Sequence, residues 1–348
     1  MRYILPPVAD LNSLPFDAII DVRSPSEFAE DHVPGAMNLP VLSDKERATV
    51  GTIYVQDSPF KARKIGAALV ARNAARHLEQ SLMAMNGGWK PLVYCWRGGQ
   101  RSGSFATILQ QVGWRAKVID GGYKTYRKRV KQALYDEPFA PGIVLLDGNT
   151  GTAKTDILKA LAARGVQVID LEALANHRGS LFGAQAGGQP SQKAFESALA
   201  RIVAGMDASR PVVVEAESSK IGQLVVPPQL WAAMRAAPRL EIQAPLAARA
   251  AYLASSYADI ANDNARLVNT LDKLRSYHAG DTIQRWLDLA GAGKMQALAA
   301  ALMAEHYDTR YAKARAKKAD ITPFAVSGLE AADIEAVAAW VEGFLARR

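Results

Sequence analysis

The residue of this chain best placed for covalent chemistry is a single cysteine. Cys95 follows an apolar run at residues 92–94 and is the only cysteine among 348 residues. Two arginines and two glycines come soon after it: Arg97, Gly98, Gly99 and Arg101. Glycine permits the positive φ angles with which backbone N–H groups converge on one atom, and a following helix N-terminus adds partial positive charge. A thiol held there ionises readily, and the thiolate is the nucleophile.

A buried, unreactive cysteine is the simpler interpretation, because free cysteine commonly packs as a small hydrophobe. A core position, however, does not require arginines and glycines beside it. We therefore predict that Cys95, Arg97 and Arg101 are catalytic. The other residues of the loop are expected to surround a bound anion: Trp96, Gly98, Gly99, Gln100 and Ser102.

A second stretch has the spacing of a phosphate-binding loop. It follows a buried-strand pattern at residues 143–147, precedes a helical pattern, and departs from G-x-x-x-x-G-K-[ST] only at Ala153. Lys154 is expected to reach the terminal phosphates, and Thr155 to hold Mg²⁺. The predicted phosphate-binding residues are Gly148, Asn149, Thr150, Gly151, Thr152, Ala153, Lys154 and Thr155.

Further candidates for this second site lie downstream. Glu215 directly follows a predicted strand at residues 211–214, as a second Mg²⁺ ligand does in many P-loop proteins. Arg249 comes after the strand predicted at residues 239–243, where kinase-like P-loop enzymes often place a phosphate-facing arginine. A glycine-flanked polar segment has the composition of a binding loop that orders on its ligand: Asn176, His177, Arg178, Gly179 and Ser180.

A basic run with interleaved aromatic residues occupies residues 123–131. On a helix it could follow a phosphate backbone, and the predicted RNA contacts are Lys124, Arg127, Lys128, Arg129 and Lys131. The net charge of +8 and the sequence pI of about 9.5 favour a polyanionic partner such as RNA. A solvated basic surface explains the charge equally well.

Composition limits the class of protein. With 49% hydrophobic residues, the chain is long enough for two folded domains, and a boundary is expected near residues 138–142. One cysteine excludes an internal disulfide and a multi-cysteine metal site, and no haem, flavin or zinc is expected. No apolar run reaches the roughly 18 residues of a membrane span, and the N-terminus lacks a signal-peptide pattern, so we expect a cytoplasmic protein.

The elements that position Cys95 resemble a rhodanese domain. The shared motifs are Asp-Val-Arg at residues 21–23, Glu-Phe at 27–28, His-Val-Pro-Gly-Ala-Met-Asn at 32–38, and the cysteine loop. A strand is predicted at residues 16–20, followed by a short helix that Ser24 caps. The resemblance implies a mostly parallel sheet with the cysteine at the end of a central strand. Asp21, Arg23 and His32 are expected to hold loops rather than to react.

The fold class is therefore α/β. A rhodanese-like domain is expected over residues 1–137. A P-loop NTPase-like parallel-sheet domain with a helical C-terminal part is expected over residues 138–348.

As a whole, the chain resembles the bacterial tRNA 2-selenouridine synthase family. The stretches that carry this are residues 95–102, 148–155, 171–183, 189–192 and 215–222. The resemblance implies conversion of wobble (U34) 2-thiouridine to 2-selenouridine. Geranyl diphosphate alkylates the sulfur, and selenium from selenophosphate, carried by Cys95, then replaces it. It also implies tRNAs for Lys, Glu and Gln as partners and contact with a selenophosphate-producing enzyme. That the diphosphate binds the P-loop is a hypothesis from the loop's spacing, and we expect a monomer.

Three other interpretations remain. The Cys-x5-Arg spacing from Cys95 to Arg101 fits a Cys-dependent phosphatase, although the fused P-loop domain and Tyr94 argue against it. A tRNA sulfurtransferase is the second, because nothing in the loop distinguishes sulfur from selenium. The third is an RNA-binding protein with a degenerate P-loop, against which the intact cysteine loop counts.

Overall fold

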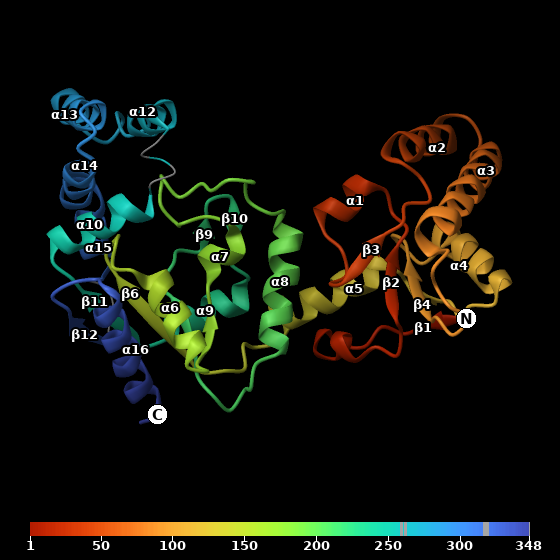
Figure 1. Cartoon of the computed structure of the whole chain (residues 1–348), viewed down its shortest axis with the longest axis horizontal. Coiled ribbons are helices and arrows are strands. Elements are labelled where there is room, and N and C mark those ends of the chain that lie inside the picture. The colour runs from red at the N-terminus through yellow and green to blue at the C-terminus, as the bar shows by residue number, and fades with distance from the viewer. Residues whose placement is uncertain (258–259, 261–262, 316–319, 348) are drawn as a thin grey trace. The chain divides into compact units, whose positions relative to one another are not determined.

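The computed structural model describes residues 1–257, 260, 263–315 and 320–347. The chain divides into two compact units (Figure 1). Unit 1 comprises Met1–Pro138 and Pro190–Gly205, and unit 2 comprises Phe139–Gln189 and Met206–Arg348. In the ranges described, no helix combines the length and apolar character that a membrane span needs.

Unit 1 is built on a parallel five-stranded sheet in the order β1-β5-β4-β2-β3. Its strands are β1 (Arg2–Tyr3), β2 (Ala18–Asp21), β3 (Ala36–Asn38), β4 (Pro91–Tyr94) and β5 (Lys117–Ile119). The central strand β4 is buried throughout, and Cys95 directly follows it. The predicted parallel sheet, with the cysteine at the end of a central strand, is therefore confirmed.

The helices of unit 1 are α1 (Pro25–Glu30), α2 (Asp44–Gln56), α3 (Pro59–His77), α4 (Gln100–Val112), α5 (Tyr123–Lys131) and α8 (Gln192–Ala204). Ser24 and Glu27 form a capping box at α1, as the Ser-Pro start predicts. Helix α3 begins at Pro59, because Ser58 caps it and Pro59 occupies its first turn. A π-helical turn, Leu78–Leu82, continues it.

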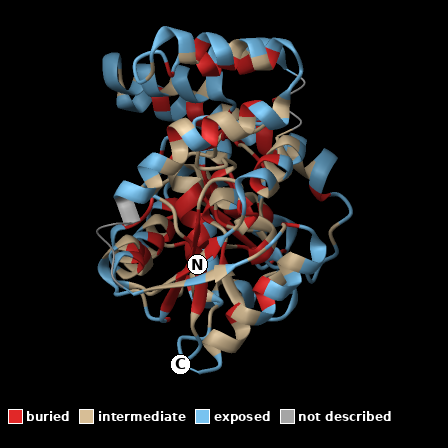
Figure 2. Cartoon of the chain, turned by 90° about the vertical axis from the view of Figure 1, so that its left-hand side faces the viewer, coloured by how far each residue is buried: buried red, intermediate tan, exposed pale blue. Residues whose placement is uncertain are grey.

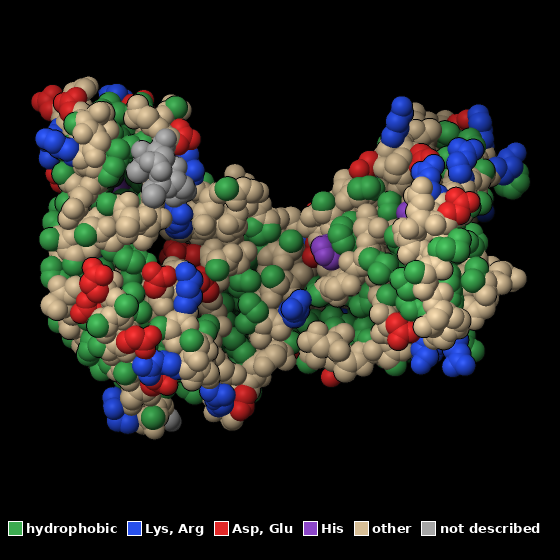
Figure 3. All heavy atoms as spheres, in the orientation of Figure 1, with side chains coloured by type: hydrophobic (Ala, Val, Ile, Leu, Met, Phe, Trp, Pro, Cys, Tyr) green, Lys and Arg blue, Asp and Glu red, His purple; other side chains and the backbone are tan. Residues whose placement is uncertain are grey.

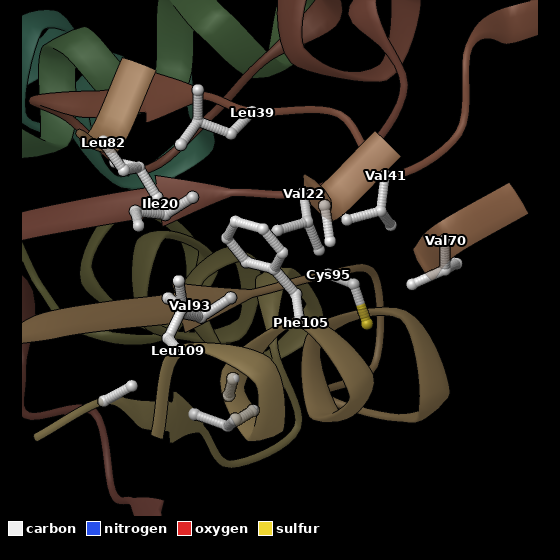
Figure 4. Close-up of a cluster of buried hydrophobic side chains, with 14 of the residues drawn as sticks. Ile20, Val22, Leu39, Val41, Val70, Leu82, Val93, Cys95, Phe105 and Leu109 are labelled. Atoms are coloured by element: carbon white, nitrogen blue, oxygen red, sulfur yellow. The ribbon is translucent and has the colours of Figure 1, made fainter. Parts of the chain in front are cut away.

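The main core of unit 1 lies between the sheet and its helices. Buried side chains from β2, β4 and α4 form it, among them Ile20, Val93 and Phe105. Figure 4 shows Cys95 within this cluster. The reactive candidate is thus also a packed core residue, which holds its backbone in place.

Unit 2 contains a second parallel sheet, in the order β12-β11-β6-β8-β7. Its strands are β6 (Ile143–Gly148), β7 (Gln167–Ile169), β8 (Val212–Glu215), β11 (Arg239–Gln243) and β12 (Ile321–Ala325). Helices α6 (Lys154–Ala163) and α16 (Ala331–Leu345) pack apolar side chains against it. Figure 2 shows buried residues concentrated along the strands and on the inner sides of the helices.

The C-terminal half of unit 2 is largely helical, as predicted. After α10 (Leu246–Ser256) come α12 (Asn264–Asp272), α13 (Gly280–Gly291), α14 (Met295–Leu302) and α15 (Asp308–Arg315). A fully buried Trp286 lies in their shared core. The segments between the strands of the sheet contain four further elements: α7 (Leu171–Ala175), β9 (Lys220–Ile221), β10 (Leu224–Val225) and α9 (Pro228–Ala236).

Candidate active sites

The Cys95 loop lies between β4 and α4. Cys95 is 4% exposed, and its Sγ accepts a hydrogen bond of 3.2 Å from the hydroxyl of Ser102 in the first turn of α4. The structure therefore brings these two predicted loop residues together. A hydroxyl donor stabilises a thiolate, or an anion carried on the sulfur.

A neighbouring turn holds the loop in shape. Gly98 has φ +63°, and a Cβ there would lie 2.5 Å from the carbonyl oxygen of Ile119. Gly122 has φ +60°, and a Cβ there would collide with the carbonyl oxygen of Cys95. The first N–H groups of α5 complete the contact, because Tyr123 N donates to Cys95 O at 2.9 Å. The Gly121-Gly122 pair in the sequence could have indicated this support.

The two candidate arginines of the loop have different environments. Arg97 is exposed, whereas Arg101 forms an ion pair of 2.8 Å with Glu27, which Arg47 also contacts at 3.0 Å. Burial acts to raise the pKa of Glu27, but the hydrogen bond and charge of Arg101 outweigh it and hold this pKa below its usual value. The charge of Arg101 is thus largely matched by Glu27, and Arg97 keeps the more available charge.

Asp21 and Arg23 hold loops, as expected. Both are fully buried, and they form an ion pair of 2.7 Å. Arg23 also donates to the carbonyl oxygen of Asp31 at 2.6 Å, and its guanidinium lies 3.9 Å from the Tyr123 ring centroid. His32 contacts Phe28 O through Nδ1 at 3.0 Å.

In unit 2, β6 leads into the predicted phosphate loop and α6 begins at Lys154. Ala153 has φ +54° and ψ +28°, the left-handed conformation that the usual glycine adopts at this position without strain. Within the loop, Thr152 Oγ1 donates to Asn149 O at 2.9 Å, and Lys154 Nζ to Gly148 O at 3.3 Å. The P-loop geometry is therefore kept despite the alanine.

Two carboxylates face Lys154 across the pocket above this loop, Glu172 and Glu217. Burial acts to lower the pKa of Lys154, but the negative charge of neighbouring groups, both glutamates included, raises it overall. Burial, and then repulsion from Glu217, raises the pKa of Glu172 to about 8. Burial also raises the pKa of Glu217. Sequence reasoning did not select these two residues.

Glu215, the predicted metal ligand, lies beneath this pocket rather than in its lining. It is fully buried, and its Oε1 accepts a hydrogen bond of 2.5 Å from Glu172 N. Burial raises its pKa well above the usual value. Glu215 is therefore not placed to hold a metal in this pocket, whereas Glu172 and Glu217 line it.

Arg249 also differs from its predicted role. It is 5% exposed, forms an ion pair of 2.7 Å with Asp308, and donates to Thr150 O at 3.2 Å. It does not line the phosphate pocket. The guanidinium supports the loop from within the fold, so the prediction of a phosphate-facing arginine does not hold here.

Four residues of the predicted binding loop line the phosphate pocket: Asn176, Arg178, Gly179 and Ser180. Asn176 folds the segment, donating to Ala186 O at 2.9 Å and Gly188 O at 2.8 Å. His177 Nδ1 accepts from Gly179 N at 3.2 Å. Arg178 and Ser180 line the pocket, and a Cβ on Gly179 would lie 2.6 Å from Glu172 Oε1.

An apolar pocket adjoins the phosphate pocket. It encloses about 590 Å³, including its open mouth. Four residues line both pockets: Thr150, Ser180, Leu253 and Tyr257. The remaining lining is mostly apolar and includes Phe182, Ile260, Leu267, Leu298, Leu302 and Met303. The two pockets together suit a ligand with a phosphate end and a hydrocarbon end.

The donor set of the phosphate pocket fits Mg²⁺ when a phosphate is present. No group of three or more His, Cys, Asp or Glu side chains suited to a metal occurs in the described ranges. Mg²⁺, however, commonly uses one or two carboxylates together with substrate phosphates and water. Thr155, Glu172 and Glu217 could supply these protein ligands.

The predicted RNA contacts on α5 fall into two groups. Lys124, Lys128 and Lys131 are exposed and line a groove. Arg127 also lines this groove, but its guanidinium pairs with Glu196, and Arg129 donates to Leu5 O at 3.3 Å. The prediction therefore does not hold for these two arginines, whose side chains bind within unit 1.

Comparisons with known proteins identify two families, each matching one part of the chain. Residues 141–285 match the family described as tRNA 2-selenouridine synthase AAA domain, and residues 8–129 match the rhodanese-like domain family. The tRNA 2-selenouridine synthase of Nitrosomonas europaea is 36% identical over 66% of this chain, and the alignment spans 61% of that relative. That of Psychromonas ingrahamii is 33% identical over 72% of this chain and 67% of its own length. The relative in Pseudomonas syringae pv. tomato is 31% identical over 97% of this chain and 96% of its own.

Proposed function

The chain belongs to the tRNA 2-selenouridine synthase family, and we propose that it replaces the sulfur of wobble (U34) 2-thiouridine in tRNA with selenium. The 31% identity over 97% of the chain supports this substrate class. We further propose two steps, because a thiocarbonyl sulfur leaves poorly until it is alkylated. The sulfur first attacks geranyl diphosphate and releases diphosphate. Geranylthiolate then leaves C2 of the base, selenium from selenophosphate takes its place, and water cleaves the P–Se bond, which releases phosphate.

The adjoining pockets of unit 2 are the observation that carries the geranyl step. The diphosphate would lie on the N–H groups of the P-loop beside Lys154, at the N-terminus of α6. The geranyl chain would enter the apolar pocket past Leu253 and Tyr257. Thr155, Glu172 and Glu217 would hold Mg²⁺. When bound, Mg²⁺ neutralises charge on the leaving diphosphate.

The Cys95 loop is assigned to the selenium step. Its thiolate can bond to C2 of the alkylated base and expel geranylthiolate, and the selenium of selenophosphate then displaces the Cys95 thiolate from C2. The Ser102 hydroxyl lies 3.2 Å from this sulfur. Arg97 is the nearby cation available for an anionic donor, since Arg101 pairs with Glu27. The tRNAs for Lys, Glu and Gln are the proposed substrates.

Nucleoside mass spectrometry of tRNA tests both assignments. Cells lacking the protein would be complemented with wild type, Cys95→Ala, Lys154→Ala or the exposed control Lys90→Ala. Wild type and the control should restore 2-selenouridine. Cys95→Ala should accumulate S-geranyl-2-thiouridine, because only the second step is blocked. Lys154→Ala should leave 2-thiouridine.

Two results would contradict the proposal in different places. Geranylation that survives Lys154→Ala would remove the geranyl step from the P-loop. Selenouridine that is independent of the protein would remove the function itself.

A further inference from the structure

A groove in unit 1 lies beside the Cys95 loop and has a strongly cationic lining. The cationic residues that line it are Arg97, Lys124, Arg127, Lys128, Lys131 and Lys193. Asp136 is the one acidic residue among the described residues that line it. Elsewhere, Lys and Arg side chains occur in several separate places on the face drawn in Figure 3, so net charge alone does not locate a polyanion site.

One wall of the groove is a face of α5. Lys124, Lys128 and Lys131 are spaced i, i+4 and i+7, which places them in one row along the helix. The opposite side of α5 is buried through Tyr126 and Val130. The helix is thus held with its lysine row outward, ready to follow a chain of phosphates without reorganisation.

Lys193 comes from α8, which a buried polar network fixes against α5. Glu196 pairs with Arg127, and Ser197 donates to Asp31 at 2.9 Å. Tyr123 also donates to Asp31, at 2.7 Å. Lys193 itself pairs with Glu30 at 2.6 Å, but the side chains of this pair are 38% and 45% exposed. Such a surface pair is weak enough to yield to a phosphate.

Trp96 provides an aromatic surface in the same groove. It directly follows Cys95, and its ring centroid lies 5.3 Å from that of Tyr123 and 5.9 Å from Lys193 Nζ. The guanidinium of the buried Arg23 lies over the Tyr123 ring. Trp96 is half-buried, so part of its side chain is exposed to solvent. Base stacking on such a ring is tolerant of sequence.

We propose that this groove binds single-stranded RNA, with one base stacked on Trp96 and phosphates along Lys193 and the α5 lysine row. The combination of aromatic surface and aligned cations favours RNA over an acidic protein, which would not need the ring. Taking this RNA as the anticodon loop rests on the proposed function. A base on Trp96 would lie one residue from Cys95.

Binding of an anticodon stem-loop RNA to the full chain, over a series of salt concentrations, tests the groove. Lys193→Ala should weaken binding several-fold and lower the slope of log affinity against log salt by about 0.7, the value for one phosphate contact on a single strand. Lys61→Ala is the matched control. Lys61 also forms one exposed ion pair, with Asp57 at 2.6 Å, but does not line the groove.

Trp96→Ala should weaken binding roughly tenfold, and Trp96→Phe should restore most of it, because stacking needs an aromatic face. Circular dichroism and thermal unfolding would verify that each variant folds. Irradiation of RNA that carries 2-thiouridine at the wobble position should cross-link it to the peptide containing Trp96.

The outcomes separate the two proposals. If wild type modifies tRNA while Lys193→Ala binds with the affinity and slope of Lys61→Ala, the groove is not the RNA site and the proposed function stands. The groove proposal would also be overturned if folded Trp96→Ala bound the RNA as tightly as wild type, or if polyglutamate competed for the groove as well as the RNA does. If wild type binds the RNA as expected but leaves 2-thiouridine unmodified, the proposed function fails and the groove stands.

Discussion

Single residues in this protein acquire their roles from partners far away in the sequence. Arg101 has the spacing of an anion-binding arginine, yet Glu27, 74 residues earlier, takes its charge. Arg249 behaves similarly with Asp308. In both cases the ion pair is largely shielded from water, so it is worth more than an exposed pair and holds its loop in one shape.

The Glu27–Arg101 pair makes a prediction at this scale. Glu27→Gln should lower the free energy of unfolding at pH 7 by about 1–3 kcal/mol, between the values for exposed and buried pairs. The folded pKa of Glu27 lies below its ordinary value of 4.5, so ionised Glu27 stabilises the fold above that pH, and this contribution is lost as pH falls through the folded pKa.

Denaturant unfolding at neutral and at acidic pH would measure this, and the difference between wild type and Glu27→Gln should shrink in acid. The exposed ion pair between Lys61 and Asp57 offers a control, because Asp57→Asn should lower the free energy of unfolding by less than about 1 kcal/mol. If Glu27→Gln lowered the free energy of unfolding equally at both pH values, the charge of Glu27 would not be what stabilises the fold.

Among the elements, the P-loop turn shows a backbone conformation that its sequence does not favour. Ala153 is buried and left-handed, at φ +54°. Alanine can occupy this region at a cost of about 1–2 kcal/mol, whereas a β-branched residue is excluded more strongly. Packing of β6 and α6 against the sheet core therefore imposes the turn.

Ala153→Val should lower stability by roughly 2 kcal/mol or more and abolish geranyl transfer, since the loop N–H groups would no longer converge. Ala153→Gly should keep both. Ala162→Val, at an exposed position of the same helix, should cost only about 0.5 kcal/mol of helix propensity. Thermal unfolding and geranylation assays would measure the series. A fully active, stable Ala153→Val would exclude a strained turn.

For the whole molecule, α8 is the element that departs most from the order of the sequence. It follows the polar segment at the phosphate pocket along the chain, yet it belongs to unit 1. Phe195 and Leu199 are fully buried there, beside the network of Asp31 and Arg127. The domain boundary predicted at residue 137 did not anticipate that α8 belongs to unit 1. An amphipathic helix pattern predicts a buried face, but it does not indicate which core that face packs against.

Phe195→Ala should therefore destabilise unit 1 by about 3–5 kcal/mol. Hydrogen exchange of the full chain should show faster exchange in β4 and α5, with β6 and β8 unchanged. Phe324→Ala is the mirrored control, because Phe324 stacks on Trp340 at 4.6 Å in the core of unit 2. Faster exchange confined to β6 and β8 in Phe195→Ala would place α8 with the other unit.

The sequence by itself determined the two strand–loop–helix units, the parallel sheets and the family. Each of these depends on local features: the glycines around Cys95, the Gly148–Thr155 spacing, and apolar runs that must be buried on both faces. Local φ/ψ preferences and hydrophobic periodicity act over a few residues, so they can be read in order along the chain.

Only the tertiary structure decided which charged groups meet. Glu172 and Glu217 face Lys154, Arg101 binds Glu27, and α8 brings Lys193 beside Trp96. These pairings join positions that lie from 18 to 97 residues apart in the sequence. They depend on how the sheets and helices pack, and burial then determines which charges must be matched and which stay available for a ligand.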